Sequence, residues 1–299
     1  MNISDIKTIL NGDATPNTGQ YRVAMGKLYD FLTAFMGTDS ADTATLATLL
    51  GVTLPQKSGI VGGMRNAKMR VAAASATANF TADEVIVKTA LGGEQRYLKG
   101  VNGNINLGAV GAGGMDVGSA PISGFVCMYL GYNPDTGQSR LFTQDATAAA
   151  LGEVYGGTNL PAGYTMTALV GVWPTDSSRR FKIGYQFDRN VFLASAVAFQ
   201  FTGQRPSPTS FSVSSLIPKN AKTMRGVLSV TCPTSQAIYS SVGADASNTG
   251  LVTASASPST AASDTFDSVP IITEQTLYCT STSNADTPTI NVACTGYSF

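Results

Sequence analysis

The stretch FVCMYLGYNPDTG, residues 125–137, combines two signals that decide the fold of this chain. Its first part, Phe125–Tyr132, is a short run rich in apolar and aromatic residues, and such a run next to a turn is typical of a strand. Its second part predicts a tight turn, because Pro134 fixes φ and Gly137 can take the left-handed region. We therefore expect a β-strand that ends in a reverse turn.

The same pattern recurs along most of the chain and predicts a mainly β fold. It predicts two antiparallel β-sandwich or jelly-roll-like domains, a middle one over residues 59–205 and a C-terminal one over residues 206–299. The boundary follows from a change in composition after Arg205-Pro206-Ser207-Pro208. The remaining predicted strands are Lys68–Ala73, Glu84–Thr89, Thr167–Val172, Lys182–Phe187, Phe211–Leu216, Thr223–Thr231, Ala237–Val242, Val269–Thr273, Leu277–Ser281 and Thr289–Tyr297.

Residues 1–58 differ from the rest and predict a short α-helical segment. Apolar residues there recur at alternating steps of four and three, as in the seam of a coiled coil. We expect this stripe to mediate oligomerisation, while an amphipathic helix packed within one subunit is the alternative. The residues of the stripe are Tyr21, Met25, Leu28, Leu32 and Phe35.

Composition limits the kinds of catalytic and metal-binding site that the chain can contain. The chain has no histidine, which excludes Ser–His–Asp and Cys–His catalysis and the common zinc patterns. Charged residues make up only 13%, and Lys plus Arg equal Asp plus Glu at 19 each. So few charges indicate either that much of the surface is buried against other copies or neighbouring proteins, or that hydroxyl groups keep the surface soluble. No Lys or Arg follows Arg225, so the C-terminal end is acidic and is not expected to bind nucleic acid.

The cysteines and the N-terminus indicate a protein folded in a cytoplasm. Cys127, Cys232, Cys279 and Cys294 lack CxxC spacing and are expected to be buried thiols. Cys279 and Cys294 would face each other if the last two strands formed a hairpin. The sequence has no apolar run long enough to cross a membrane, and MNISDIKTIL lacks a secretory apolar core.

Candidate sites in the sequence are few, and no cofactor, metal or catalytic residue is expected. Asp264 and Asp267 are the nearest carboxylate pair for glycoside hydrolysis, but a solvated role in a loop is the stronger interpretation. Asp245, with Asn248 or Asp264, contains the oxygen ligands that calcium prefers but not the spacing of a known loop. The basic cluster Arg65, Lys68 and Arg70 is interpreted as a solvated β-edge or as a docking patch for an acidic partner.

A glycan platform is a further possibility, because sugar rings stack on flat apolar faces. Most of the aromatic residues in the acidic end are expected to be core or subunit contacts, and the loops 243–263 and 283–288 are better candidates for recognition. The receptor-binding residues are left unassigned. The aromatic candidates are Tyr239, Phe266, Tyr278, Tyr297 and Phe299.

Three stretches resemble phage tail-fibre or receptor-binding, tail spike-like, proteins. They are LYDFLTAFMGTDSADTATLATLLGV (28–52), GEVYGGTNLPAGYTMTALVGVWP (152–174) with Phe181–Arg189, and IPKNAKTMRGVL (217–228) through the terminal GYSF. The resemblance implies a homotrimeric fibre in the virion tail, assembled in the host cytoplasm. It also implies an N-terminal part docked on tail or baseplate proteins and a distal part that binds a host-cell surface glycan or outer-membrane receptor.

The expected function is therefore that of a non-enzymatic tail fibre that attaches the virion to its host. A collar or decoration fibre without a receptor role is the first alternative. A polysaccharide depolymerase is the second, although the chain shows no internal repeat of the kind that builds a β-helix. An adhesin made from prophage modules is a further alternative.

Overall fold

A computed structural model describes residues 59–232, 237–283 and 287–299. Over these ranges the chain consists of β-strands, turns and loops, without helices, and the named strands pair antiparallel throughout. The mainly β prediction is confirmed. No helix in this part of the chain is long and apolar enough to cross a membrane. The predicted helical segment 1–58 and its five stripe residues lie outside the described residues.

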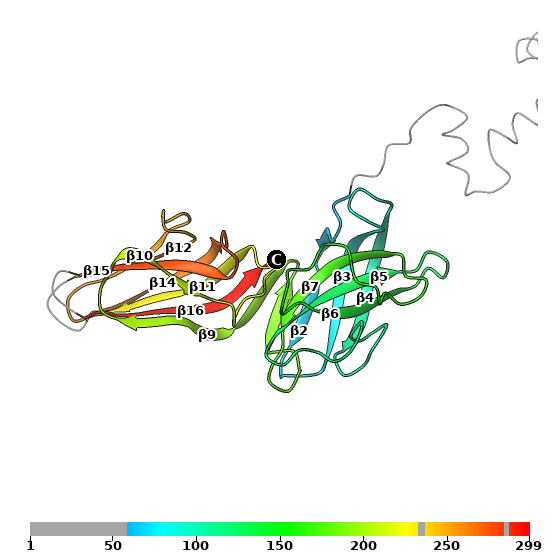
Figure 1. Cartoon of the computed structure of the whole chain (residues 1–299), viewed down its shortest axis with the longest axis horizontal. Coiled ribbons are helices and arrows are strands. Elements are labelled where there is room, and N and C mark those ends of the chain that lie inside the picture. Colours follow the sequence, from blue (N-terminus) through cyan, green and yellow to red (C-terminus); the bar gives the residue numbers. More distant parts are fainter. Residues whose placement is uncertain (1–58, 233–236, 284–286) are drawn as a thin grey trace, which may run out of the picture. The chain divides into compact units, whose positions relative to one another are not determined.

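Strands β1 to β8 make up what we call the first lobe (Figure 1). Strand β3 is its hub, because it pairs with β1, β2, β4 and β7. The bounds are β1 Met64–Arg65, β2 Lys68–Val71, β3 Thr77–Lys88, β4 Gln95–Asn106, β5 Phe125–Tyr132, β6 Ser139–Asp145, β7 Met166–Pro174 and β8 Gly184–Phe187.

The core of the first lobe is formed by β5 and β7, which pair with each other and are buried at every residue. Their nearly continuous apolar sequences fit a position covered on both faces. The predicted strand at β5 is confirmed, and so is the turn that follows it. The side-chain oxygen of Asn133 accepts hydrogen bonds from the amides of Asp135 and Thr136 at 2.9 and 3.2 Å, and Gly137 has a φ of 69°.

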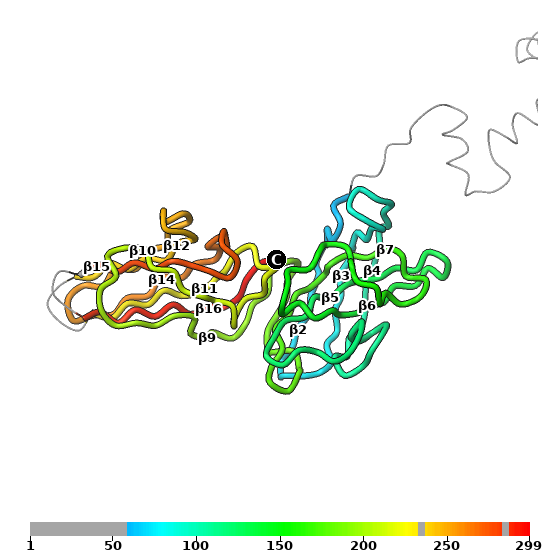
Figure 2. Tube along the Cα trace, in the orientation of Figure 1, coloured from blue at the N-terminus to red at the C-terminus, as the bar shows by residue number. Residues whose placement is uncertain are grey.

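Strands β9 to β16 make up the second lobe, which has two layers of sheet. One layer continues the large sheet in the order β14-β11-β16-β9-β8, and the other is the four-stranded sheet β10-β15-β12-β13. Figure 2 shows β9 running beside the C-terminal strand β16. The bounds are β9 Asn190–Thr202, β10 Arg205–Ser212, β11 Thr223–Thr231, β12 Ile238–Gly243, β13 Val252–Ala256, β14 Ala261–Pro270, β15 Thr276–Ser283 and β16 Thr289–Ser298.

Alternation along β11 explains how a sequence rich in Ser and Thr builds this lobe. Met224, Gly226, Leu228 and Val230 are buried, and the residues that alternate with them are only partly covered. The inner face therefore receives the apolar side chains, as a period of two requires. Between the layers, Phe199 of β9 stacks on Phe211 of β10 with ring centroids 4.6 Å apart.

Two sequence-based expectations about the second lobe are wrong. The stretch 243–263 was expected to be a loop, but it contains β13 and the start of β14. Cys279 and Cys294 do not face each other across a hairpin, because β15 and β16 lie in different sheets. The predicted boundary at residue 205 falls between β9 and β10, and both of these strands pair with later strands of the second lobe.

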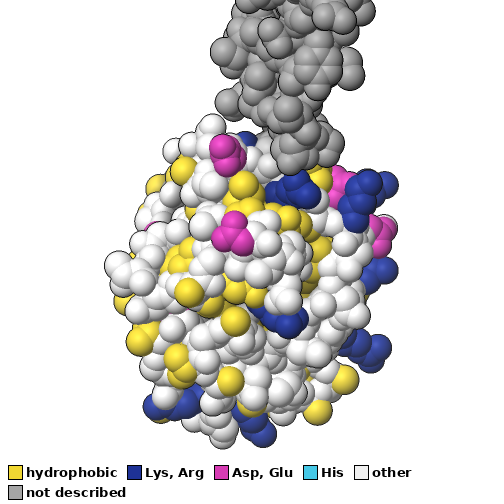
Figure 3. Space-filling model, turned by 90° about the vertical axis from the view of Figure 1, so that its right-hand side faces the viewer, with side chains coloured by type: hydrophobic (Ala, Val, Ile, Leu, Met, Phe, Trp, Pro, Cys, Tyr) yellow, Lys and Arg dark blue, Asp and Glu magenta, His cyan; other side chains and the backbone are white. Residues whose placement is uncertain are grey.

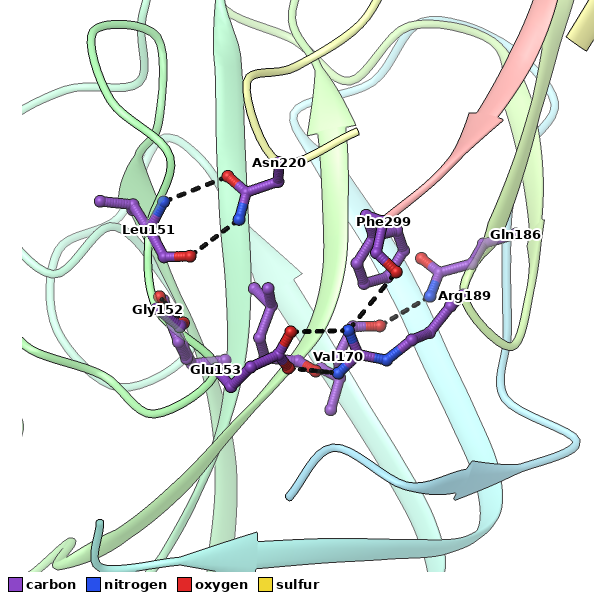
Figure 4. Close-up of polar contacts among 10 residues, drawn as sticks. Leu151, Gly152, Glu153, Val170, Gln186, Arg189, Asn220 and Phe299 are labelled. Carbon is purple, nitrogen blue, oxygen red and sulfur yellow. Dashed lines mark hydrogen bonds and ion pairs between the residues drawn. The ribbon is translucent and has the colours of Figure 1, made fainter. Parts of the chain in front are cut away.

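Hydrogen bonds join the two lobes beyond the continuous sheet (Figure 4). The guanidinium of Arg189 binds the carboxylate of Glu153 through both terminal nitrogens and lies over the ring of Phe299 at 5.2 Å. The side chain of Asn220 accepts from the amide of Leu151 at 3.2 Å and donates to its carbonyl at 2.8 Å. The C-terminal residue is thus tied to the loop before β7.

Replacing Arg189 with methionine is expected to lower the free energy of unfolding by about 1–3 kcal/mol, because it leaves a partly covered carboxylate without its partner. Thermal unfolding followed by circular dichroism measures this. Arg180→Met is the matched control, since Arg180 is 46% exposed and the carboxylate of its partner Asp176 keeps hydrogen bonds from the amides of Ser178 and Arg180. We expect the control to lower the free energy of unfolding by at most about 0.5 kcal/mol. Equal costs for the two variants would contradict the assigned role of Arg189.

Candidate functional site

The candidate site is an exposed sheet surface built by the register of neighbouring strands. One cross-strand row runs through Lys68 of β2, Phe187 of β8 and Asn190 of β9. The row beside it runs through Tyr185, Phe192 and Gly296. We call the surface formed by these two rows the open face; its members are Asn104, Asn79, Arg70, Tyr185, Phe192, Gly296 and Arg225 in one row, and Asn102, Thr81, Lys68, Phe187, Asn190, Ser298 and Thr223 in the other.

Three aromatic side chains stand at the centre of the open face. Tyr185, Phe187 and Phe192 are 38%, 38% and 39% exposed, which is high for rings in the middle of a sheet. The rings of Tyr185 and Phe192 lie 6.3 Å apart with an interplanar angle of 31°. They form a tilted pair of apolar surfaces that is open to solvent.

The contacts of Arg225 explain why the row contains a glycine, Gly296. The guanidinium of Arg225 lies over the ring of Phe192 at 4.1 Å, and its Nη2 donates to the side-chain oxygen of Asn190 at 3.1 Å. Gly296 separates β11 from β9 at this point, and a Cβ there would meet Arg225 Cδ at 3.1 Å. The absent side chain lets the arginine reach across β16.

Asparagines occupy the other end of the open face. The Nδ2 of Asn79 donates to the side-chain oxygens of Asn102 and Asn104 at 2.8 and 3.0 Å. Because both of those oxygens face Asn79, the amide nitrogens of Asn102 and Asn104 are left for solvent or a ligand. All three residues are exposed. The cluster thus presents hydrogen-bond donors held at fixed positions.

Basic residues lie between the asparagines and the aromatic rings. Lys68 and Arg70 are exposed, and neither forms an ion pair with any described residue. The solvated β-edge expected for this basic cluster is wrong for Lys68 and Arg70, since β2 pairs with β3 on one side and β8 on the other. Arg65 is exposed on β1, for which β3 is the one partner among the described strands.

The acids nearest to this cluster by register already accept hydrogen bonds. Asp188 follows Phe187 and accepts from the amide of Ala67 at 2.8 Å. Asp83 lies two residues beyond Thr81 and accepts from Asn66 at 2.6 Å.

The surface is hollowed on both sides of Arg70. One depression of about 670 Å³ is lined by Arg70, Tyr185 and Phe192 among others. A second, of about 480 Å³, is lined by Arg70, Asn79 and Asn104 among others. Both depressions are shallow and open to solvent. Arg70 therefore contributes to two adjoining depressions, of which the one beside the aromatic rings is the more apolar.

The aromatic residues singled out in the sequence are not part of the open face. Tyr239 is 58% exposed on β12, and Tyr278 is partly buried on β15, so both belong to the four-stranded sheet. Phe266, Tyr297 and Phe299 are buried, as expected for core residues. Sequence reasoning found the basic cluster but missed its aromatic and amide neighbours.

The acidic candidates lie on a strand and in a turn of the second lobe. Asp264 and Asp267 are exposed on the strand β14, and not in a loop as expected. Asp245 uses its carboxylate in a turn, accepting from the amides of Ser247 and Thr249 at 2.9 and 3.0 Å. Among the described residues, no three His, Cys, Asp or Glu side chains gather closely enough to hold a metal ion.

The turn at Asp245 makes a prediction for acid stability. Hydrogen bonds from Thr249 lower the pKa of the Asp245 carboxyl below its ordinary value of 3.8. Its contribution to stability is therefore present above about pH 4 and is lost as the pH falls below this value. We expect the melting temperature of Asp245→Asn to fall less than that of the unaltered chain between about pH 4 and pH 2. Parallel pH curves would contradict the prediction.

Burial raises the pKa of several thiol and phenol groups. All four cysteines are buried thiols, as predicted. Burial raises the pKa of Cys279 and of Cys294 to about 11, so both remain protonated at neutral pH and are poor nucleophiles. Burial likewise raises the pKa of Tyr155 to about 12, and its hydroxyl donates to Asp116 at 2.8 Å.

The open face presents side chains of three kinds that can contact a ligand. Neither of its two rows contains a carboxylate, a cysteine or a histidine. Its rings offer stacking, its amides offer hydrogen-bond donors, and its basic groups offer charge. Figure 3 shows one face of the molecule, where hydrophobic side chains gather in the middle and charged groups are scattered around them. No protein-family model matches the chain, and no curated protein matches it.

Proposed function

We propose that this chain is a tail-fibre protein of a phage virion that attaches the particle to a host-cell receptor. Residues 1–58 attach it to tail or baseplate proteins, and the β lobes bind the host surface. The observation that carries the proposal is the open face, where solvent-exposed rings, amides and cations are held on a sheet without catalytic groups beside them. Binding surfaces of this kind are specific when a rigid scaffold positions them.

The second support is the chemical character of the chain. Few charged residues, no histidine and a large β part are suited to assembly and recognition more than to catalysis. The resemblance of three stretches to tail-fibre proteins points the same way. We further propose the homotrimer that this resemblance implies, in which the stripe of Tyr21, Met25, Leu28, Leu32 and Phe35 joins three copies.

Trimerisation makes weak sites effective. Three copies of one open face on a single fibre, and several fibres on one particle, raise the avidity for a repetitive cell surface well above the affinity of one site. A fibre of this kind therefore needs no deep pocket. Shallow depressions such as those beside Arg70 are sufficient.

The native mass of the purified full-length chain tests the assembly. We expect a species of about three times 30.9 kDa, resistant to SDS without heating. Replacing Leu28 and Leu32 together with serine is expected to reduce it to the mass of one chain. A monomeric unaltered chain would contradict the trimeric fibre and favour a decoration subunit.

A further inference from the structure

We propose that the open face binds an acidic polysaccharide, one whose sugar units carry carboxylate or phosphate groups. The proposal deepens the proposed function, on which it rests, by naming the site and the class of receptor. It assigns recognition to the surface shared by β4, β3, β2, β8 and β9. The C-terminal loops and aromatic residues singled out by the sequence are not required.

The shape of the open face fits an extended ligand. The row from Asn104 to Phe192 crosses five strands, and four strand spacings of about 4.8 Å span roughly 19 Å. Both depressions lie along this row and share Arg70. A chain of several sugar units can therefore lie across the strands and contact the whole row.

The chemistry of the row fits sugars. The exposed rings of Tyr185 and Phe192 provide flat apolar surfaces for the C–H faces of pyranose rings. The amide nitrogens of Asn102 and Asn104 point away from the Asn79 contact that occupies their oxygens, so they can donate to hydroxyl groups. Rings at one end and amide donors at the other allow one ligand to make both kinds of contact.

The charge of the row favours an acidic ligand. Arg70 stands between the two depressions, and Lys68 lies in the next row, while neither has a carboxylate partner among the described residues. An arginine in this position binds a carboxylate or phosphate through two parallel hydrogen bonds. The acidic group of the ligand would therefore sit at Arg70, with sugar rings extending to both sides.

Single-stranded nucleic acid would also stack on exposed rings near cations, but it fits less well. Nucleic-acid grooves carry many cations along the backbone path, whereas the open face has only Lys68, Arg70 and Arg225 and the chain has no net charge. The amide nitrogens of Asn102 and Asn104 can donate hydrogen bonds to neighbouring hydroxyl groups of a sugar ring. Nucleic acid is kept as an outcome of the test.

Ligand-observed NMR titration of the full-length chain tests the proposal with defined probes. The acidic probes are tetragalacturonate and a mannose-6-phosphate-bearing tetrasaccharide, the neutral probe is maltotetraose, and an eight-residue oligothymidylate represents nucleic acid. We expect at least one acidic probe to bind about tenfold more tightly than the neutral probe, which corresponds to one charge-assisted contact. The two acidic probes distinguish carboxylate from phosphate recognition.

Matched variants locate the site. Tyr185→Ser and Arg70→Gln are each expected to weaken binding of the acidic probe by about tenfold. Tyr239→Ser and Arg180→Gln make the same substitutions at exposed positions away from the open face, and both are expected to bind as the unaltered chain does. Circular dichroism and the native mass confirm that the four variants fold and assemble alike.

Four results would overturn the proposal. The first is no binding of either acidic probe at millimolar concentration, and the second is a loss of affinity in Tyr239→Ser equal to that in Tyr185→Ser. The third is tighter binding of oligothymidylate than of the acidic probes. The fourth is a change of native mass in Tyr185→Ser, which would make a second copy of the chain the occupant of the open face. If the chain still blocks phage adsorption in any of these cases, the proposed function stands and only this site is wrong. If it binds the acidic probe through Tyr185 but does not block adsorption, the receptor role is wrong.

Discussion

Replacing Trp173 with alanine is expected to lower the free energy of unfolding by about 3–5 kcal/mol, which is the usual cost of removing a buried tryptophan. Trp173 lies on β7 and is 1% exposed. Its indole nitrogen donates to the carbonyl of Lys182 at 2.9 Å, and its ring meets Phe181 edge to face at 6.4 Å. The substitution removes these contacts and leaves a cavity beside Gly184, which begins β8.

Chemical denaturation followed by circular dichroism measures this cost, because the variant lacks the only tryptophan of the chain. Trp173→Phe is the control, since it keeps a ring and loses mainly the hydrogen bond. Its expected cost is nearer 1–2 kcal/mol, about that of the lost hydrogen bond and a smaller ring. A cost below about 1 kcal/mol for the alanine variant would show that this part of the core is not packed as described.

Replacing Gly296 with valine is expected to be at least as damaging, with a loss of about 3 kcal/mol or more. Gly296 has a φ of 151°, and a Cβ at this position would lie 2.1 Å from the carbonyl oxygen of Val191. That atom belongs to the backbone of β9, so it cannot move aside as a flexible side chain would. The register of β16 against β9 would have to change.

Gly156→Ala is the control for this substitution, because no atom lies within 4 Å of a Cβ there and its φ is not in the left-handed region. We expect it to change stability by no more than about 0.5 kcal/mol. An equal loss of unfolding free energy in both variants, measured by thermal unfolding, would contradict the close approach of β9 and β16. Because Gly296 also lies in the open face, its valine variant should lose ligand binding together with folding.

The strands that could be predicted are those with a strong apolar pattern. β5 and β7 are nearly continuous apolar runs, and β11 and β16 alternate clearly, so the sequence predicts all four within a few residues. Strand β4, with the sequence QRYLKGVNGNIN, was missed because most of its residues are polar or glycine. Such a strand has little apolar periodicity to detect.

Strand β10 was missed for a different reason. Its sequence RPSPTSFS was interpreted as a domain boundary because of Pro206 and Pro208. The strand lies at the edge of the four-stranded sheet, where proline costs no ladder hydrogen bond on the open side. Proline therefore marks an edge here and not an interruption.

The open face could be predicted only in part. Arg70 and Lys68 stand out in the sequence as a cluster of like charges, but Tyr185, Phe192 and Asn79 become their neighbours only through the strand order β3-β2-β8-β9. This order depends on pairing between segments more than a hundred residues apart, and no local pattern specifies it. That these five exposed residues share one face can be recognised only when the register of the strands is known.

Competition for phage adsorption tests the receptor role most directly. Host cells are incubated with an excess of the purified full-length chain before addition of the phage of which we propose it to be the tail fibre. We predict that the chain lowers the fraction of adsorbed phage, that Tyr185→Ser fails to do so, and that Tyr239→Ser competes as well as the unaltered chain. Undiminished adsorption in the presence of a correctly assembled chain would contradict the receptor role.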